Sequence, residues 1–91
     1  MTALLVHCRG NTRVFTGPFS IGRRGADLLI DDDYVSPIHA LFRPDGLHWD
    51  IEDNGSTNGT RVNGATISRN YPLVKGDQVT VGRTTFTVVP V

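Results

Sequence analysis

Cysteine is nearly absent from this chain, since Cys8 is the only one among its 91 residues. A single thiol cannot close an internal disulfide, so the disulfide-stapled scaffolds of small secreted proteins are excluded and a reducing, cytoplasmic location is favoured. Cys8 alternates with Val6 in an apolar run, which predicts a half-buried strand residue rather than a reactive thiol.

An excess of either charge is also lacking, because nine basic side chains balance nine acidic ones and the net charge is zero. The broad basic face on which nucleic-acid binding normally depends is therefore missing, and we expect no nucleic-acid partner. No apolar run approaches the roughly 20 residues of a membrane helix, and residues 1–8 lack the basic start of a signal peptide. The sequence predicts no membrane insertion.

Helical periodicity is the third absence, since no window repeats apolar residues at helical spacing over the length of a helix. Short β-rich runs separated by Gly, Asn and Pro take its place. A chain of this length builds one modest core, which predicts a single all-β domain, either a β-sandwich or a small barrel. The predicted strands cover residues 3–8, 12–16, 19–22, 28–30, 39–43, 47–53, 60–62, 78–81 and 84–89.

Two local patterns refine the strand prediction. Leu47, Trp49 and Ile51 alternate with polar residues, so we expect these three side chains to share the buried face of their strand. The dipeptide Asn63-Gly64 is the preferred two-residue turn of a β-hairpin, which should join residues 60–62 to a strand that begins at Ala65.

The loop from Asn54 to Gly59 holds two hydroxyls, two carboxamides and two glycines in six residues. It is either an elaborate turn or a loop that binds an anion through hydroxyls and exposed backbone N–H groups. Arg23 and Ser36 lie on segments of similar loop character. The function depends on whether these two residues converge with the loop.

Arginine and serine each suit phosphate recognition for a different reason. The planar guanidinium of Arg23 can donate two charge-assisted hydrogen bonds to one phosphate, although a solvated surface arginine is the alternative, a role that fits Arg24 better. The hydroxyl of Ser36 rotates freely to reach a phosphate oxygen, or it is a turn serine that precedes Pro37.

Signals for catalysis, metals and cofactors are weak. Ser36 and His39 could pair as nucleophile and base, but no G-x-S-x-G elbow or oxyanion hole accompanies them, so we predict no catalytic residues. His39 is better explained as a structural residue whose two ring nitrogens tie adjacent loops together. Asp31–Asp33 lacks calcium-loop spacing and reads as a solvated loop, no zinc-ligand spacing occurs, and no glycine-rich phosphate motif is present. We therefore expect neither metal nor cofactor.

Three segments together carry a family resemblance: Phe19–Arg23, Ser36 with His39 three residues later, and Asp53–Gly64. In their order and spacing they resemble the forkhead-associated (FHA) domain, a phosphothreonine-peptide recognition module. The likeness runs from about Leu4 to Val89, so we expect residues 1–91 to form a single domain. It implies an antiparallel β-sandwich of about eleven short strands, with the binding loops at one end.

The resemblance also implies a set of site residues. Arg23, Ser36 and Thr57 match positions that contact the phosphate, and Asn58 matches the residue that holds the main chain of the peptide. The positions expected to shape the site are Gly22, His39, Ser56, Gly59 and Asn63. One fixed cation and several neutral donors can bind a phosphate dianion without a broadly basic surface.

One position departs from the family pattern. Pro37 stands where the family often has a basic or polar residue, so the loop should make one contact fewer while being stiffer. Tyr34 and Val35, just before the binding serine, suggest a preference for an apolar residue about three positions after the phosphothreonine.

The predicted function is non-catalytic docking onto a protein, or onto a segment of the parent protein, that a Ser/Thr kinase has phosphorylated on threonine. The alternative is a phosphate-independent scaffold that binds partners through a side face of the sandwich. The first predicted strand follows Met1 closely, which we take to disfavour a switch that binds its own phosphorylated amino-terminal tail. We expect an amino-terminal domain of a longer protein, with a stand-alone adaptor as the alternative.

Overall fold

The computed structural model describes residues 2–91, and all regular structure in that range is β-strand. The strands are Leu4–Cys8 (β1), Asn11–Phe15 (β2), Phe19–Gly22 (β3), Leu28–Leu29 (β4), Ala40–Asp45 (β5), His48–Asp53 (β6), Thr60–Val62 (β7), Ala65–Thr66 (β8), Tyr71–Leu73 (β9), Gln78–Val81 (β10) and Thr84–Pro90 (β11). No helix within residues 2–91 is long and apolar enough to cross a membrane.

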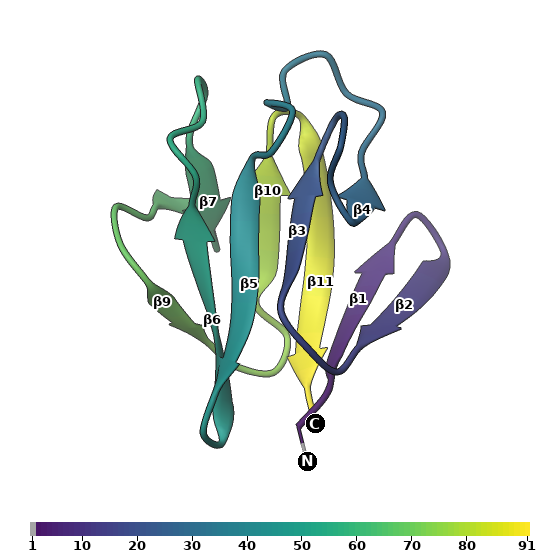
Figure 1. The fold of residues 1–91 in the computed structure, drawn as a ribbon, viewed down its shortest axis with the longest axis vertical. Helices are drawn as coiled ribbons and strands as arrows, with labels where there is room; N and C mark the ends of the chain where they lie inside the picture. Colours follow the sequence, from purple (N-terminus) through teal and green to yellow (C-terminus); the bar gives the residue numbers. More distant parts are fainter. Residues whose placement is uncertain (1) are drawn as a thin grey trace.

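Two sheets face each other across the core (Figure 1). One sheet has six strands in the order β2-β1-β11-β10-β7-β8, and the other has five in the order β4-β3-β5-β6-β9. Neighbouring strands run antiparallel except for the short β3–β4 pair. The prediction of an antiparallel β-sandwich of about eleven short strands is confirmed, and the small barrel is excluded.

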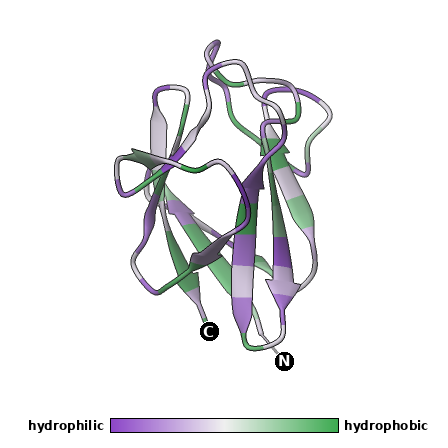
Figure 2. Ribbon diagram, turned by 90° about the vertical axis from the view of Figure 1, so that its left-hand side faces the viewer, coloured by the Kyte–Doolittle hydropathy of each residue, from purple (hydrophilic) through white to green (hydrophobic). Residues whose placement is uncertain are grey.

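The core consists of side chains that alternate inward from both sheets, as the alternating colours along the strands of Figure 2 illustrate. Trp49, Phe42 and Phe86 are its largest members and are almost completely buried. Phe19 stacks on Phe42 with ring centroids 4.6 Å apart, which joins β3 to β5 on the inner face of the five-stranded sheet. This packing anchors the strands whose ends present the loops described below.

The prediction that Leu47 faces the core is wrong, because its side chain is 94% exposed. Asp45 pairs with His48, so Gly46 and Leu47 form the two-residue turn of the β5–β6 hairpin and do not belong to the strand. Trp49 and Ile51 are buried as predicted.

Strand β9 was not foreseen, since it has only three residues and contains Pro72. Proline is tolerated there because β9 lies at the edge of its sheet, where one side of the backbone needs no partner. The predicted Asn63-Gly64 hairpin is confirmed: both residues have positive φ, at 51° and 86°, and Val62 pairs with Ala65.

Three loops meet at one end of the sandwich, opposite the β5–β6 turn and the chain termini (Figure 1). They follow β3, precede β5 and connect β6 to β7, and the β10–β11 turn lies beside them. The residues of the predicted site, apart from Asn63, lie in these loops or at their borders.

Candidate functional site

A small polar pocket of about 170 Å³ lies among the loops at this end. It brings together all four residues predicted to contact a ligand, although they come from three separate loops. The pocket is lined by Arg23, Asp33, Tyr34, Val35, Ser36, Pro37, Thr57 and Asn58.

The Arg23 guanidinium is held through its Nε, which leaves its two terminal nitrogens available to a ligand. Its Nε donates to the Val35 carbonyl oxygen at 3.0 Å, and its backbone N–H donates to the Ser36 carbonyl oxygen, also at 3.0 Å. The two terminal nitrogens make no hydrogen bond within residues 2–91, and the side chain is exposed. The guanidinium is thus oriented at the pocket with its charge-assisted donors free.

Ser36 links two of the loops through its hydroxyl. Its Oγ accepts a hydrogen bond from the Thr57 backbone N–H at 3.1 Å, so the hydroxyl hydrogen remains free to be donated to a ligand. Asn58 makes a similar bridge, because its Nδ2 donates to the Tyr34 carbonyl oxygen at 2.8 Å. The carboxamide oxygen and the second N–H of Asn58 remain available for the main chain of a peptide.

His39 is fully buried beneath the pocket, and its ring joins two of the loops. Its Nδ1 accepts the backbone N–H of Ser36 at 3.0 Å, so Nδ1 carries no hydrogen. Nε2 therefore carries the proton and donates it to the Gly59 carbonyl oxygen at 2.8 Å. Because the ring meets the backbone of Ser36 and not its hydroxyl, the two residues do not form a nucleophile–base pair.

Asp53 organises the loop between β6 and β7 by accepting several hydrogen bonds. The Ser56 backbone N–H donates to Oδ2 at 2.9 Å, while the hydroxyls of Ser56 and Thr60 both donate to Oδ1. The Ser56 Oγ in turn accepts the Gly59 N–H at 2.9 Å. Burial acts to raise the pKa of the Asp53 carboxyl, but the hydrogen bonds from Ser56 and Thr60 outweigh it and hold that pKa below its ordinary value.

Gly22 lets two stretches of backbone touch. A Cβ at this position would lie 1.9 Å from the Pro37 carbonyl oxygen, so no other residue fits without moving the loop that carries Ser36. The backbone N–H of Arg24 donates to the same Pro37 oxygen at 3.2 Å, which completes the contact. Gly59, by contrast, has room around it but needs its positive φ of 81°.

Asn63 does not reach the pocket. Its Nδ2 donates to Asp77 at 2.9 Å and its Oδ1 accepts the Gln78 N–H at 2.9 Å, so the side chain ties the β7–β8 turn to the loop before β10. Among the predicted site residues it is the one that the structure leaves outside the loop cluster.

A second brace for the pocket was missed by the sequence interpretation. Asp32, expected in a solvated loop, accepts hydrogen bonds from the N–H of Tyr34, the N–H of Arg83 and the hydroxyl of Thr84, at 2.8 to 2.9 Å. The Thr84 hydroxyl, followed by the Tyr34 N–H, lowers the pKa of the Asp32 carboxyl. Arg83 and Thr84 are 51 and 52 residues away from Asp32 in the sequence, in the β10–β11 region, and no local sequence motif indicates these contacts.

The same turn also positions Tyr34. The Arg83 guanidinium carbon lies 4.1 Å from the centre of the Tyr34 ring, and its Nη2 donates to the Tyr34 hydroxyl at 2.8 Å. Val35 is only 1% exposed and belongs to the core. The Val35 side chain therefore packs inward and Tyr34 is accompanied by a cation, while the preference for an apolar residue about three positions after the phosphothreonine stays a prediction.

This combination of features defines a class of protein: a β-sandwich that presents a cation, a hydroxyl and a carboxamide from loops at one end. The chain belongs to the FHA domain family, because the family model for the FHA domain matches residues 19–82. The FHA domain is a binding module. The family assignment made from the sequence is confirmed.

Individual relatives agree with this assignment. FhaB of Mycolicibacterium smegmatis, an FHA domain-containing protein, is 38% identical over 82 residues, which cover 87% of this chain and 53% of FhaB. The chain thus spans about half the length of these curated relatives.

Solved structures give the same result. A domain studied for phosphothreonine-dependent FHA interactions superposes with a TM-score of 0.88 at 30% identity, covering 96% of this chain and 95% of that one. Mycobacterium tuberculosis EmbR, in complex with a low-affinity phosphopeptide, gives a TM-score of 0.90 at 26% identity, covering 96% of this chain and 24% of EmbR.

Gly22→Ala tests the backbone contact beneath Ser36. We expect a loss of about 1–3 kcal/mol in the free energy of unfolding, because the new methyl group must displace the Pro37 backbone. Gly17→Ala is the matched control, since a Cβ there meets nothing within 4 Å and φ is not positive, so its stability should be unchanged or slightly higher. Urea denaturation measures both, and equal effects of the two substitutions would contradict the steric argument.

The lowered pKa of Asp53 predicts that part of the free energy of unfolding is lost at acid pH. Its folded pKa lies below the ordinary 3.8, so its stabilisation is complete above that value and is lost as the pH falls through the lower folded value. Asp53→Asn should be less stable at neutral pH and should lose stability less steeply between about pH 5 and pH 2. Asp31→Asn, at an exposed carboxylate, is the control in the same denaturation series. Parallel pH profiles for the wild type and Asp53→Asn would refute the prediction.

Proposed function

We propose that this domain is a phosphothreonine-dependent interaction module. It docks onto partner proteins, or onto a segment of its parent protein, after a Ser/Thr kinase has acted on them. The observation that carries the proposal is the convergence of the free Arg23 donors, the Ser36 hydroxyl and the Thr57 backbone in one pocket of about 170 Å³.

The proposed role of each pocket residue follows from the hydrogen-bond donors and acceptors that it leaves unused within residues 2–91. The terminal nitrogens of Arg23 donate two charge-assisted hydrogen bonds to the phosphate, and the Ser36 hydroxyl donates a third. Thr57 supplies a further hydroxyl, while Asn58 pairs with the main chain of the bound peptide. A phosphate of about −1.5 to −2 charge is thereby recognised by a chain of zero net charge.

Pro37 contributes rigidity in this scheme and makes no hydrogen bond to the ligand from its nitrogen. Its carbonyl oxygen accepts the Arg24 N–H, and the Ser36 carbonyl oxygen accepts the Arg23 N–H, which fastens the serine loop to the end of β3. A loop that is ordered before binding loses less conformational entropy on binding, which offsets the missing contact.

We further propose that the domain catalyses no reaction and acts in the cytoplasm. Support for the first statement is that the Ser36 Oγ meets a backbone N–H and His39 is committed to two backbone groups. Support for the second is the single free thiol, Cys8, which suits a reducing compartment.

Arg23→Ala tests the proposed role of the cation. Removing a hydrogen bond to a charged group costs about 1.5–3 kcal/mol, so we expect roughly 10- to 150-fold weaker binding of a phosphothreonine peptide. Isothermal titration calorimetry measures this, with the unphosphorylated twin peptide expected not to bind. Arg24→Ala is the matched control, because its neighbouring guanidinium does not line the pocket. Unchanged partner binding by Arg23→Ala would favour the phosphate-independent scaffold instead.

Affinity for the peptide should fall with acidification if the dianion is recognised. The second phosphate pKa is about 6, so binding should weaken as the pH drops from 8 to 5. The lowered pKa values of Asp32 and Asp53 keep both loop braces ionised over this range, so the pocket itself should persist. Titrations at several pH values, each with an unfolding curve as control, measure the effect, and a flat profile would show that the dianion is not what is bound.

A further inference from the structure

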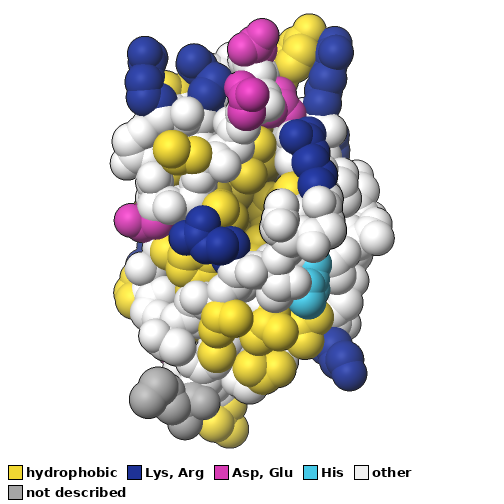
Figure 3. All heavy atoms as spheres, turned by 90° about the vertical axis from the view of Figure 1, so that its right-hand side faces the viewer, with side chains coloured by type: hydrophobic (Ala, Val, Ile, Leu, Met, Phe, Trp, Pro, Cys, Tyr) yellow, Lys and Arg dark blue, Asp and Glu magenta, His cyan; other side chains and the backbone are white. Residues whose placement is uncertain are grey.

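A larger groove lies on a side of the sandwich, where the β1–β2 hairpin and the segment around β4 diverge. Its volume is about 480 Å³, within the range of pockets that bind ligands. Figure 3 shows this face as a hollow with hydrophobic side chains in its floor and both basic and acidic side chains at its borders. None of the residues that line it also lines the phosphate pocket.

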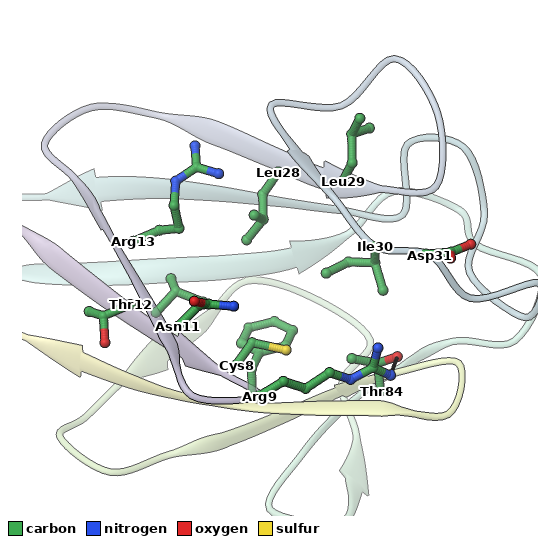
Figure 4. A pocket seen from close by; sticks show the side chains of 12 residues that line it. Cys8, Arg9, Asn11, Thr12, Arg13, Leu28, Leu29, Ile30, Asp31 and Thr84 are labelled. Atoms are coloured by element: carbon green, nitrogen blue, oxygen red, sulfur yellow. Dashed lines mark hydrogen bonds between the residues drawn. The ribbon is translucent and has the colours of Figure 1, made fainter.

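The floor of the groove is apolar and continuous with the core. Val6, Phe86 and Ile30 form it and are 1%, 2% and 7% exposed. Leu29 lies at the groove with 61% of its surface exposed, and the Cys8 side chain also reaches the groove (Figure 4). The exposed Leu29 extends the apolar surface of this floor to the outside of the molecule, where a partner can cover it.

The wall formed by β2 is polar at positions that face inward. Arg13 pairs with the buried Val6, and Asn11 pairs with Cys8, so both side chains lie on the inner face of their sheet. A closed sandwich has apolar residues at such positions, but β4 is only two residues long and leaves this part of β2 uncovered. Arg13 extends over the groove toward Leu28 (Figure 4).

Both strands that border the groove are edge strands. Within residues 2–91, β2 pairs only with β1 and β4 pairs only with β3, so each has one side of its backbone without a strand partner. A free edge is a template for an extended peptide, which gains main-chain hydrogen bonds there and places alternate side chains in the adjoining groove.

The charges at the groove indicate what such a peptide should carry. Arg9 and Arg13 line it on the hairpin side and only Asp31 opposes them, so the groove has a basic balance. A carboxylate opposite Arg13 would form a favourable cross-strand pair, whereas a cation there would be repelled.

We propose that this groove is a second docking site, which takes an extended segment of a partner protein. The segment pairs with the free edge of β2 and points an apolar side chain and, two residues on, a carboxylate into the groove. The apolar side chain lies on the floor near Ile30, and the carboxylate meets Arg13. Docking at this site does not depend on phosphate.

The experiment uses the sole thiol as its reporter. The probe is the peptide acetyl-Thr-Leu-Thr-Glu-Thr-Leu-Thr-amide, with a twin in which Lys replaces Glu. Because Cys8 lines the groove, the acidic peptide should slow the alkylation of Cys8 by iodoacetamide and shift the backbone NMR signals of residues 28–31. We expect it to bind about two- to fivefold more tightly than the Lys twin, as a cross-strand charge pair predicts.

Two variants sharpen the test. Arg13→Glu should reverse the preference in favour of the Lys twin, while Arg69→Glu, an exposed arginine between β8 and β9 at the opposite edges of the sheets, should leave it unchanged. Arg23→Ala should bind the acidic peptide as the wild type does, which separates this site from the phosphate pocket.

Three results would overturn the proposal. If neither peptide protects Cys8 at millimolar concentration, the inward Arg13 serves only to keep the edge of β2 unpaired. Equal protection by the Glu and Lys peptides would mean adsorption onto apolar surface without charge recognition. Sedimentation that shows self-association blocked by Arg13→Glu would assign the groove to a second copy of the chain.

Discussion

The recognition end of this domain depends on a buried imidazole whose two nitrogens have opposite roles. A backbone N–H can only donate and a carbonyl oxygen can only accept, so His39 must present a bare Nδ1 to Ser36 and a protonated Nε2 to Gly59. One neutral ring thereby joins the loop that carries Ser36 to the loop that carries Thr57 and Asn58. The hydroxyl bridge from Ser36 to the Thr57 N–H then forms without further ordering.

The partners of the loop carboxylates bear on how a chain of zero net charge can present free donors on Arg23. Two loop carboxylates, Asp32 and Asp53, accept hydrogen bonds from donors of their own surroundings and are not paired with Arg23. Their hydrogen bonds point inward and stabilise loop backbone. The carboxylate of Asp33 lies at the pocket itself. The Arg23 side chain is held through Nε alone, which leaves its terminal nitrogens available at the pocket of a chain with zero net charge.

Sequence spacing predicted the features that rest on local rules, and missed those that rest on contacts across the fold. The Asn63-Gly64 hairpin follows from the φ preferences of its two residues, and the four pocket residues follow from motifs of known order. The prediction for Leu47 was wrong because the alternation of apolar and polar residues continues from the strand into the turn. The position of that turn depends on the pairing of Asp45 with His48. The bonds from Asp32 to Arg83 and Thr84 could not be found, because nothing near either segment encodes the other.

The bonds from Asp32 to the final hairpin have a consequence for the order in which the molecule acquires its parts. The loop that carries Tyr34 and Ser36 is synthesised well before its anchors at positions 83 and 84, which belong to the final hairpin of the domain. Strand β1 likewise cannot pair with its neighbour in the six-stranded sheet until β11 has been synthesised. The sandwich and this loop can therefore close only after the final hairpin of the domain has been synthesised, because both need contacts with residues distant in sequence.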